Sequence, residues 1–311
     1  MGLATLAALG HIGAAPRFRF PRMSSLTAPA DGRFARGVLI MVITGIVLST
    51  GGPIIRQIED ASGLQITFWR SLAQGGFIFL LLAARDRGQV FASFRDVGWA
   101  GVFAGGALAL AIFGYVFSIT NTTVANTLFL LSTAPFFAAI LGYFVLHERV
   151  GAATAAAIAV ALVGVAIMVG DGLGAGRWLG NLAGIACALL SALFVIGIRL
   201  GKGVDMVPTV CLAGVFAAVL AFLAAGGAVA ATPHDVAWAA AAGAFQVGLG
   251  FVLYTIGSRY LPAAELTVLG LLEVILGPIW TWLLVGEVPS TYTVGGGIIV
   301  LAAIAGLAGW S

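Results

Sequence analysis

Residues 96–115 read DVGWAGVFAGGALALAIFGY and residues 235–254 read DVAWAAAAGAFQVGLGFVLY, so one segment recurs 139 positions later in the chain. The same shift aligns Glu148 with Glu287 and Thr154 with Thr293, which extends the repeat beyond this segment. If each copy crosses a membrane five times, the second copy enters from the opposite side and the copies form an inverted repeat. Inverted repeats are typical of transporters with alternating access.

Composition places the chain in a membrane. Of its 311 residues, 61% are hydrophobic and 9% are charged, whereas a soluble domain carries about a quarter charged residues. Continuous apolar stretches of about twenty residues cross the hydrocarbon core as helices, and their lack of alternation excludes a barrel. We predict an all-α polytopic membrane protein with ten transmembrane helices, near residues 37–56, 64–84, 97–118, 123–146, 151–170, 178–199, 206–227, 236–257, 262–285 and 290–309.

Positive charges predict the orientation. With the N-terminus inside, twelve of the fifteen Lys and Arg residues fall in cytoplasmic segments, two fall in outer segments and Arg70 falls within a span. Because Lys and Arg accumulate on the cytoplasmic side, we expect a multi-pass protein of a bacterial inner (plasma) membrane with both termini in the cytoplasm. The basic charge indicates contact with membrane lipids, rather than nucleic acid.

Four segments are expected along the chain. Residues 1–36 form a flexible cytoplasmic N-terminal tail, in which Met1 and Met23 both remain candidate starts. Residues 37–170 form the first five-helix repeat and residues 178–309 form the second, inverted one. Residues 171–177, DGLGAGR, form a linker too rich in glycine to continue a helix. The linker is either a hinge between moving bundles or a plain surface loop.

Enzyme and metal sites are not expected. Cys187 and Cys211 lie within predicted spans without clustered histidines, which disfavours both a disulfide and a metal site. None of the three histidines lies in the core of a span, so an intramembrane protease or acyltransferase lacks its base. No phosphate-binding P-loop is present. We therefore expect no catalytic residues and no cofactor, and any driving force must come from a gradient.

Glycine is abundant, with 44 residues, although it is unfavourable in a helix in water. Within lipid, small residues four positions apart allow helix backbones to approach closely. Packing within one chain and a dimer interface both remain open, so we expect a monomer or weak homodimer. The small-residue pairs are Gly101 with Gly105, Gly180 with Gly184, and Ala302 with Gly306.

Three motifs resemble one known family. Residues 125–149, with Pro135 in mid-span and His-Glu-Arg at the end, are similar to the fourth span of EamA-type ten-helix exporters of the drug/metabolite transporter superfamily. Residues 264–287, with Glu273 in mid-span, resemble the ninth span, and Phe68-Trp69-Arg70 resembles an aromatic-Arg pair in the second. The resemblance covers residues 37–309. The family often has proline directly after the ninth-span Glu, whereas here Pro278 follows later.

This resemblance implies a basket of ten helices around a central cavity that opens alternately to each side. It implies export of amino acids, including aromatic and other neutral ones, or of related small metabolites, by uniport or proton antiport. A transporter of anionic solutes, such as sugar phosphates or nucleotide sugars, stays open, as does a non-transporting membrane scaffold. The scarcity of intramembrane Lys and Arg disfavours the former, and the inverted repeat disfavours the latter.

Glu273 is the strongest candidate site residue. It lies eleven residues after Pro262, or about 16 Å along a helix, near the bilayer centre. An ionised acid there costs about 2.5–3.5 kcal/mol. Facing a hydrated cavity, it would bind a substrate ammonium group or accept a proton; alternatively, it fixes helix packing by a hydrogen bond.

Arg70 is the second intramembrane charge, about 9 Å below the outer boundary. It would pair with a substrate carboxylate, or with Glu273 when the site is empty. The alternative is a side chain that extends to the outer headgroups.

A second group of candidates would supply hydrogen bonds and aromatic walls for a small substrate. Glu148 and Glu287 close the fourth and ninth spans at opposite faces and either gate the cavity or are simply solvated. The second group comprises Trp69, Tyr115, Asn126, Ser132, Gln246, Tyr254 and Trp280, with Thr133 and Trp282 beside them.

Overall fold

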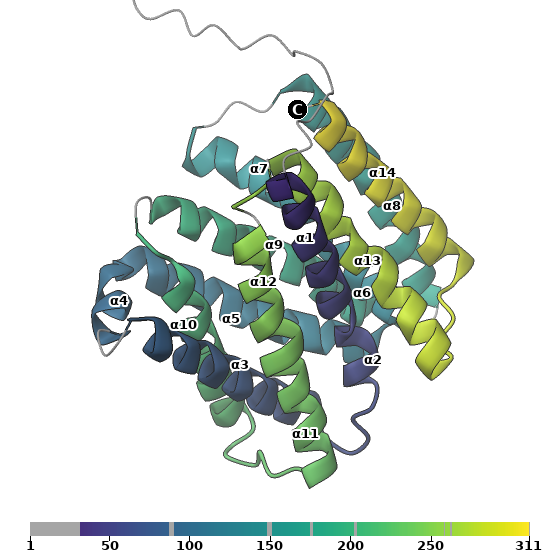
Figure 1. Ribbon diagram of the computed structural model, residues 1–311. Coiled ribbons are helices and arrows are strands. Elements are labelled where there is room, and N and C mark those ends of the chain that lie inside the picture. Colours follow the sequence, from purple (N-terminus) through teal and green to yellow (C-terminus); the bar gives the residue numbers. More distant parts are fainter. Residues whose placement is uncertain are drawn as a thin grey trace, which may run out of the picture.

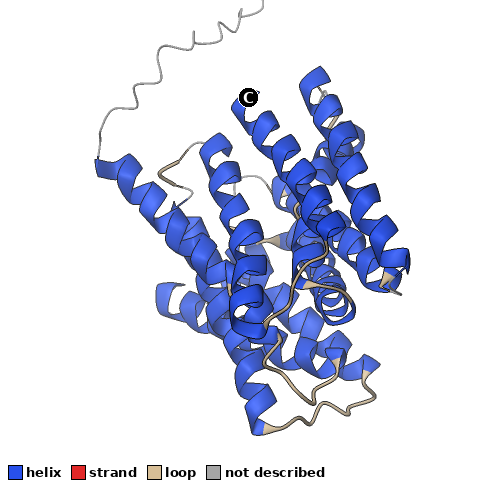
Figure 2. Ribbon diagram, turned by 90° about the vertical axis from the view of Figure 1, so that its right-hand side faces the viewer, coloured by secondary structure: helices blue, strands red, loops and turns tan. Residues whose placement is uncertain are grey.

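The computed structural model describes residues 32–86, 90–147, 151–174, 177–201, 204–257, 259–261 and 263–310. Throughout this part of the chain, every regular element is a helix (Figures 1 and 2). Ten helical segments within it are long and apolar enough to cross a membrane. The prediction of an all-α membrane protein with ten spans is confirmed.

Seven of the spans are single helices, and three are interrupted. The uninterrupted spans are α3 (Gly63–Asp86), α5 (Gly98–Asn121), α8 (Ala152–Gly174), α9 (Trp178–Leu200), α10 (Val207–Ala224), α13 (Ala263–Val285) and α14 (Thr291–Trp310). The interrupted spans are α1 (Gly32–Ser49) with α2 (Gly51–Ile55), α6 (Val124–Leu131) with α7 (Ala134–Val145), and α11 (Pro233–Ala241) with the π-helix η1 (Ala242–Leu249) and α12 (Gly250–Gly257). A short helix that the sequence did not predict, α4 (Val90–Asp96), precedes α5.

The bundle has two ends, a terminal end and a linker end. The terminal end is where α1 begins and α14 ends, and the linker end is where α8 ends and α9 begins (Figure 1). Because each span crosses once, the connections after α2, α5, α10 and α13 also lie at the linker end. An odd number of spans in each repeat gives the second repeat the opposite direction through the membrane.

Proline explains two of the interruptions. Pro53 and Pro135 lie in the first turn of α2 and α7 respectively, and proline donates no backbone hydrogen bond to the preceding turn. Hydroxyl groups satisfy carbonyls at the breaks: Ser49 Oγ donates to the carbonyl of Ile46 at 2.7 Å, and Thr133 Oγ1 donates to that of Leu130 at 2.6 Å. Breaks of this kind are tolerated in lipid when neighbouring groups restore the bonds.

The glycine-rich linker differs from its prediction. We expected residues 171–177 to interrupt the helix, but α8 continues as far as Gly174. Helix propensity is a weak preference, since each glycine costs only about 1 kcal/mol relative to alanine, and the preceding apolar turns already form the helix. Residues 175–176 lie outside the described residues, as do residues 1–31 of the predicted tail.

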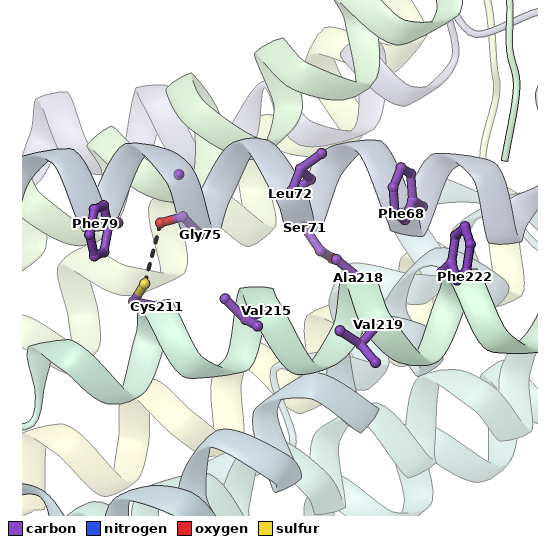
Figure 3. A pocket seen from close by; sticks show the side chains of 11 residues that line it. Phe68, Ser71, Leu72, Gly75, Phe79, Cys211, Val215, Ala218, Val219 and Phe222 are labelled. Carbon is purple, nitrogen blue, oxygen red and sulfur yellow. Dashed lines mark hydrogen bonds between the residues drawn. The ribbon is translucent and has the colours of Figure 1, made fainter. Parts of the chain in front are cut away.

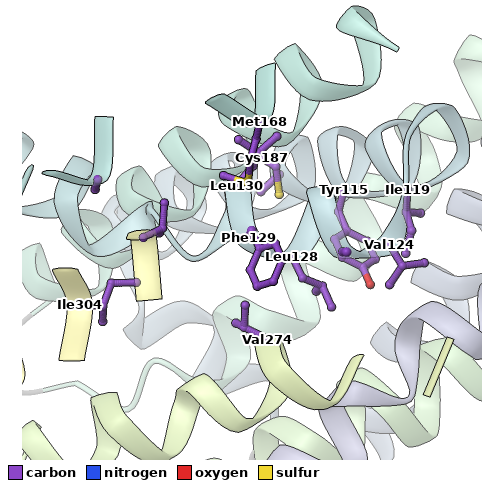
Figure 4. Close-up of a cluster of buried hydrophobic side chains, with 14 of the residues drawn as sticks. Tyr115, Ile119, Val124, Leu128, Phe129, Leu130, Met168, Cys187, Val274 and Ile304 are labelled. Atoms are coloured by element: carbon purple, nitrogen blue, oxygen red, sulfur yellow. The ribbon is translucent and has the colours of Figure 1, made fainter. Parts of the chain in front are cut away.

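The largest buried core joins both repeats around α6 (Figure 4). Phe129 of α6 and Val274 of α13 point toward one another, with Tyr115 and Leu128 beside them. Neighbouring residues on a helix point about 100° apart. The burial of Val274 in this core therefore directs Glu273 away from it, toward the middle of the bundle.

Two of the three small-residue pairs pack helices within the chain. Gly101 and Gly105 approach α10, and Gly180 and Gly184 approach the turn between α5 and α6 and the helix α6 itself. A Cβ built on Gly306 meets no neighbouring element within 4 Å, and Ala302 is exposed, so the third pair packs no helices together within the described chain. Close backbone approach explains the first two pairs.

Gly243 of η1 provides a test of the closest approach. A Cβ on Gly243 would overlap the backbone carbonyl of Arg70 on α3, and overpacking of this kind costs about 1–3 kcal/mol. We expect Gly243→Ala to lower the thermal unfolding temperature of the detergent-solubilised protein. Gly106→Ala is the matched control, because a Cβ on Gly106 meets nothing within 4 Å. Equal stability of the two variants would contradict the close contact between η1 and α3.

Candidate functional site

A cavity of about 200 Å³ lies in the middle of the bundle and contains both predicted intramembrane charges. Its walls come from α1, α3, α5, α6, α9, η1, α12 and α13, so both repeats contribute. The lining residues are Leu48, Arg70, Gln74, Leu108, Ala111, Ile112, Tyr115, Leu131, Cys187, Ser191, Gln246, Val247, Phe251 and Glu273. A small, largely apolar cavity with a few convergent polar groups is typical of a ligand site.

Arg70 is buried in this cavity, with 5% of its surface exposed. Its guanidinium lies over the ring of Tyr115, 5.1 Å from the ring centroid, and Nη2 is 3.5 Å from Gln246 Oε1. The atoms Nε and Nη1 have no hydrogen-bond partner among the described residues. The alternative in which Arg70 extends to the headgroups is therefore wrong, because contacts with Tyr115 and Gln246 hold the side chain inside the bundle.

Gln246 lies in the π-helix and connects three elements. Its Nε2 donates to the carbonyl of Leu48 in α1 at 3.1 Å, which leaves Oε1 directed at Arg70 of α3. The wider turn of a π-helix displaces residues from their regular positions, and such turns are frequent at functional sites. Gln246 was predicted from its polarity within a span, whereas the π-helix has no signal in the sequence.

Glu273 lines the same cavity from α13 and is half-buried. It interacts electrostatically with Arg70, yet no contact within 4 Å joins the two charged groups, both of which are described. The expected ion pair between Arg70 and Glu273 is thus not formed. One acidic and one basic group remain available to different parts of a bound molecule.

Three polar lining residues were not singled out from the sequence as site residues. Gln74 lies one helical turn after Arg70 and so shares its face of α3, which is a signal that the sequence contains. Cys187 and Ser191 are likewise four residues apart on α9 and line the cavity together. Their role could not be predicted because nothing in the sequence orients α9 toward α3.

Five of the predicted substrate-contacting residues lie outside the cavity lining, as do Thr133 and Trp282 beside them. Trp69 Nε1 donates to the carbonyl of Val229 at 2.8 Å, and Trp280 Nε1 donates to Ser49 Oγ at 3.1 Å. Ser132 Oγ donates to the carbonyl of Phe129 at 2.7 Å, at the break after α6. The other two are Tyr254, which is 39% exposed on the outside of α12, and Asn126, which contacts Asn181 and Thr293 at the linker end.

Glu287 connects the two repeats at the linker end. Its carboxylate accepts from Arg56 Nε at 2.7 Å and from the backbone N–H of Val124 at 2.6 Å. Arg56 Nη2 also donates to the carbonyl of Thr122 at 2.9 Å. We call this set of contacts the linker-end clasp. Glu148, the other predicted gating residue, lies outside the described residues.

A second group of contacts at this end involves buried asparagines. Asn181 Oδ1 accepts from Thr122 Oγ1 at 3.0 Å and from Asn126 Nδ2, and Asn126 Oδ1 accepts from Thr293 Oγ1 at 3.5 Å. Asn126 and Thr122 belong to the first repeat, whereas Asn181 and Thr293 belong to the second. Asn126 therefore joins the repeats rather than lining the cavity.

The N-terminus of α11 is tied to the loop after α2. Asp235 is buried, and its carboxylate accepts from the backbone N–H groups of Glu59, Asp60 and Ala61 at 2.9–3.1 Å. Together with the clasp and the asparagines, these bonds hold both repeats together at the linker end.

Two of the larger cavities in the described chain are apolar. One of about 410 Å³ lies between α3 and α10 (Figure 3), where Cys211 Sγ lies 3.3 Å from the carbonyl of Gly75. Another, of about 530 Å³, lies between α13 and α14. Neither has a charged lining residue. Within the described chain no group of three His, Cys, Asp or Glu residues could hold a metal ion.

Comparison with known proteins identifies two matching segments. Residues 35–170 and 178–309 each match the model of the EamA-like transporter family. A search of curated proteins finds no match. The chain is similar in fold to a solved structure titled "Crystal structure of protein", with a TM-score of 0.62 and 19% identity over 88% of this chain and 97% of the other.

The buried asparagine network predicts that Asn181 contributes more to thermal stability than Asn121 does. Removing the Asn181 amide leaves buried donors of Thr122 and Asn126 without their acceptor, which costs about 1–2 kcal/mol. We expect Asn181→Ala to lower the thermal unfolding temperature in detergent. The control is Asn121→Ala, since the exposed amide of Asn121 donates only within its own helix. A similar loss in both variants would show that Asn181 contributes no contact between repeats.

Proposed function

Because the chain belongs to the EamA-like transporter family, whose members are membrane transporters, we propose that it exports amino acids or related small metabolites by alternating access. Aromatic and other neutral amino acids are included. The observation that carries this proposal is the central cavity, which both repeats line and which holds Glu273 and Arg70. A scaffold would not need two charges at this depth, where each is costly.

Glu273 has the central role in the proposed mechanism. Its carboxylate would bind the substrate ammonium group, and protonation from one side would release that group and couple export to a proton gradient. Binding without protonation would give uniport instead. Both mechanisms need the cavity to face each side in turn, with the acid at a fixed site between the two repeats.

The linker-end clasp is the proposed gate of one side. Arg56 and Glu287 are 24% and 19% exposed and connect the two repeats, so their separation would open that end of the bundle. With the N-terminus in the cytoplasm, as the distribution of Lys and Arg favours, the linker end faces outward. The described state would then be closed to the outside, in a bacterial inner membrane.

Transport in proteoliposomes tests the function. We expect saturable uptake of at least one member of a panel of twenty labelled amino acids, and a loss of at least about tenfold in Glu273→Gln, because a neutral amide lacks the charge that pairs with an ammonium group. An imposed pH gradient separates proton antiport from uniport.

The matched control is Glu59→Gln, which changes an exposed acid outside the cavity and should leave transport unchanged. Uptake by the wild type no greater than in empty vesicles would remove the amino-acid proposal and direct the search to anionic solutes. Full transport in Glu273→Gln would reduce Glu273 to a packing residue.

Labelling of Cys187 tests the gate. The chain has two cysteines, so in a Cys211→Ala background the buried thiol of Cys187 reports access to the cavity. We expect Arg56→Ala or Glu287→Ala to raise the labelling rate from the linker end about tenfold, which corresponds to about 1.4 kcal/mol lost from the closed state.

The control for this experiment is Arg85→Ala, which breaks an exposed ion pair with Asp205 away from the linker end. It should leave labelling from the linker end unchanged. If Arg56→Ala and Glu287→Ala behave like this control, the clasp does not gate the cavity.

A further inference from the structure

We propose that Arg70 makes the cavity selective for solutes with a free carboxylate, and that Gln246 is the residue that positions it. This inference rests on the proposed function, because it names the chemical group by which the transporter recognises its substrate.

Two donors of the buried Arg70 guanidinium are unsatisfied within the described chain. Arginine side chains that only stabilise a fold normally satisfy their buried donors, because an unpaired buried charge is costly. Arg70 is 95% buried, since only 5% of its surface is exposed, yet Nε and Nη1 have no partner among the described residues and the side chain lines the cavity. A planar carboxylate matches the fork of N–H donors that the guanidinium presents.

The cavity presents one basic and one acidic side chain to a bound solute. Among the described lining residues, Arg70 is the only cation and Glu273 is the only carboxylate. A doubly charged phosphate would meet one cation and be repelled by the acid. A carboxylate that carries an ammonium group a short distance away would match both residues without leaving net charge in the membrane interior.

The position of Arg70 is fixed before a solute binds. Tyr115 lies against the face of the guanidinium, and Gln246 Oε1 accepts a hydrogen bond from Arg70 Nη2. Gln246 is itself fixed, because its Nε2 donates to the carbonyl of Leu48. Because the Gln246 amide is neutral, it orients the guanidinium without neutralising the charge. An acid at this position would occupy the arginine permanently.

Binding to the purified protein tests the inference independently of transport. The probes are phenylalanine, leucine, threonine and alanine, each compared with its amide and its decarboxylated amine, by microscale thermophoresis in detergent. For the wild type we expect the acids to bind about a hundredfold more tightly than the amides and amines, because those leave the guanidinium unpaired. In Arg70→Gln we expect this preference to disappear, so that the acids, amides and amines bind with about equal affinity.

Arg70→Lys keeps the charge but loses the fork, so an intermediate preference is expected. The matched control is Arg85→Gln on the same helix, away from the cavity, which should keep the wild-type preference. Because the readout is a ratio between ligands, a general loss of stability in the Arg70 variants does not imitate the expected result.

Gln246→Glu tests the positioning role. The introduced carboxylate would pair with Arg70, so affinity for the acids should fall at least about tenfold while affinity for the amides stays within about twofold of wild type. An unchanged preference for the acids in Gln246→Glu would overturn the role of Gln246.

The outcomes separate the two proposals. Acids and amides that bind the wild type equally well would overturn carboxylate recognition and leave the proposed function standing. A wild-type preference that persists in Arg70→Gln would assign the recognition to another residue and also overturn the inference. Binding of none of the probes would overturn the inference, and it would contradict the proposed function as well if the wild type also transports none of the twenty labelled amino acids.

Discussion

The burial of one arginine in the membrane interior is the constraint on which the centre of this structure depends. An isolated cation at this depth is costly, so the surrounding elements are arranged to accept it. Tyr115 supplies the face of a ring, Gln246 supplies a carbonyl oxygen, and Glu273 supplies an opposite charge at a distance. Gly243 lets the π-helix approach the backbone of Arg70 itself.

Backbone interruptions gather around the same centre. The break after Ser49 follows Leu48, whose carbonyl receives the Gln246 amide, and the break after Leu131 ends a helix whose last residue lines the cavity. In lipid, irregular backbone is tolerated where it is buried in protein or lines a cavity. The polar backbone groups that these breaks expose are therefore part of how the cavity is built.

The sequence predicts the number of spans and the location of Glu273 and Arg70 inside two of them, because both follow from the lengths of apolar stretches. It could not predict that Trp69 and Trp280 donate to Val229 and Ser49 instead of lining the cavity, since the rotation of a helix depends on its neighbours. Nor could it predict the partner of Glu287, because Arg56 is 231 residues away in the chain. Pairing at that separation follows from the tertiary arrangement of loops.

The π-helix has a consequence for the symmetry of the molecule. Tyr115 and Tyr254 are equivalent residues of the two repeats, yet Tyr115 lines the cavity at 7% exposure and Tyr254 is 39% exposed on the outside. A π-helix rotates less per residue than an α-helix, so every side chain after η1 is turned relative to its counterpart in α5. Duplicated segments can thus diverge in role through backbone winding alone, while the duplicated amino acid itself stays the same.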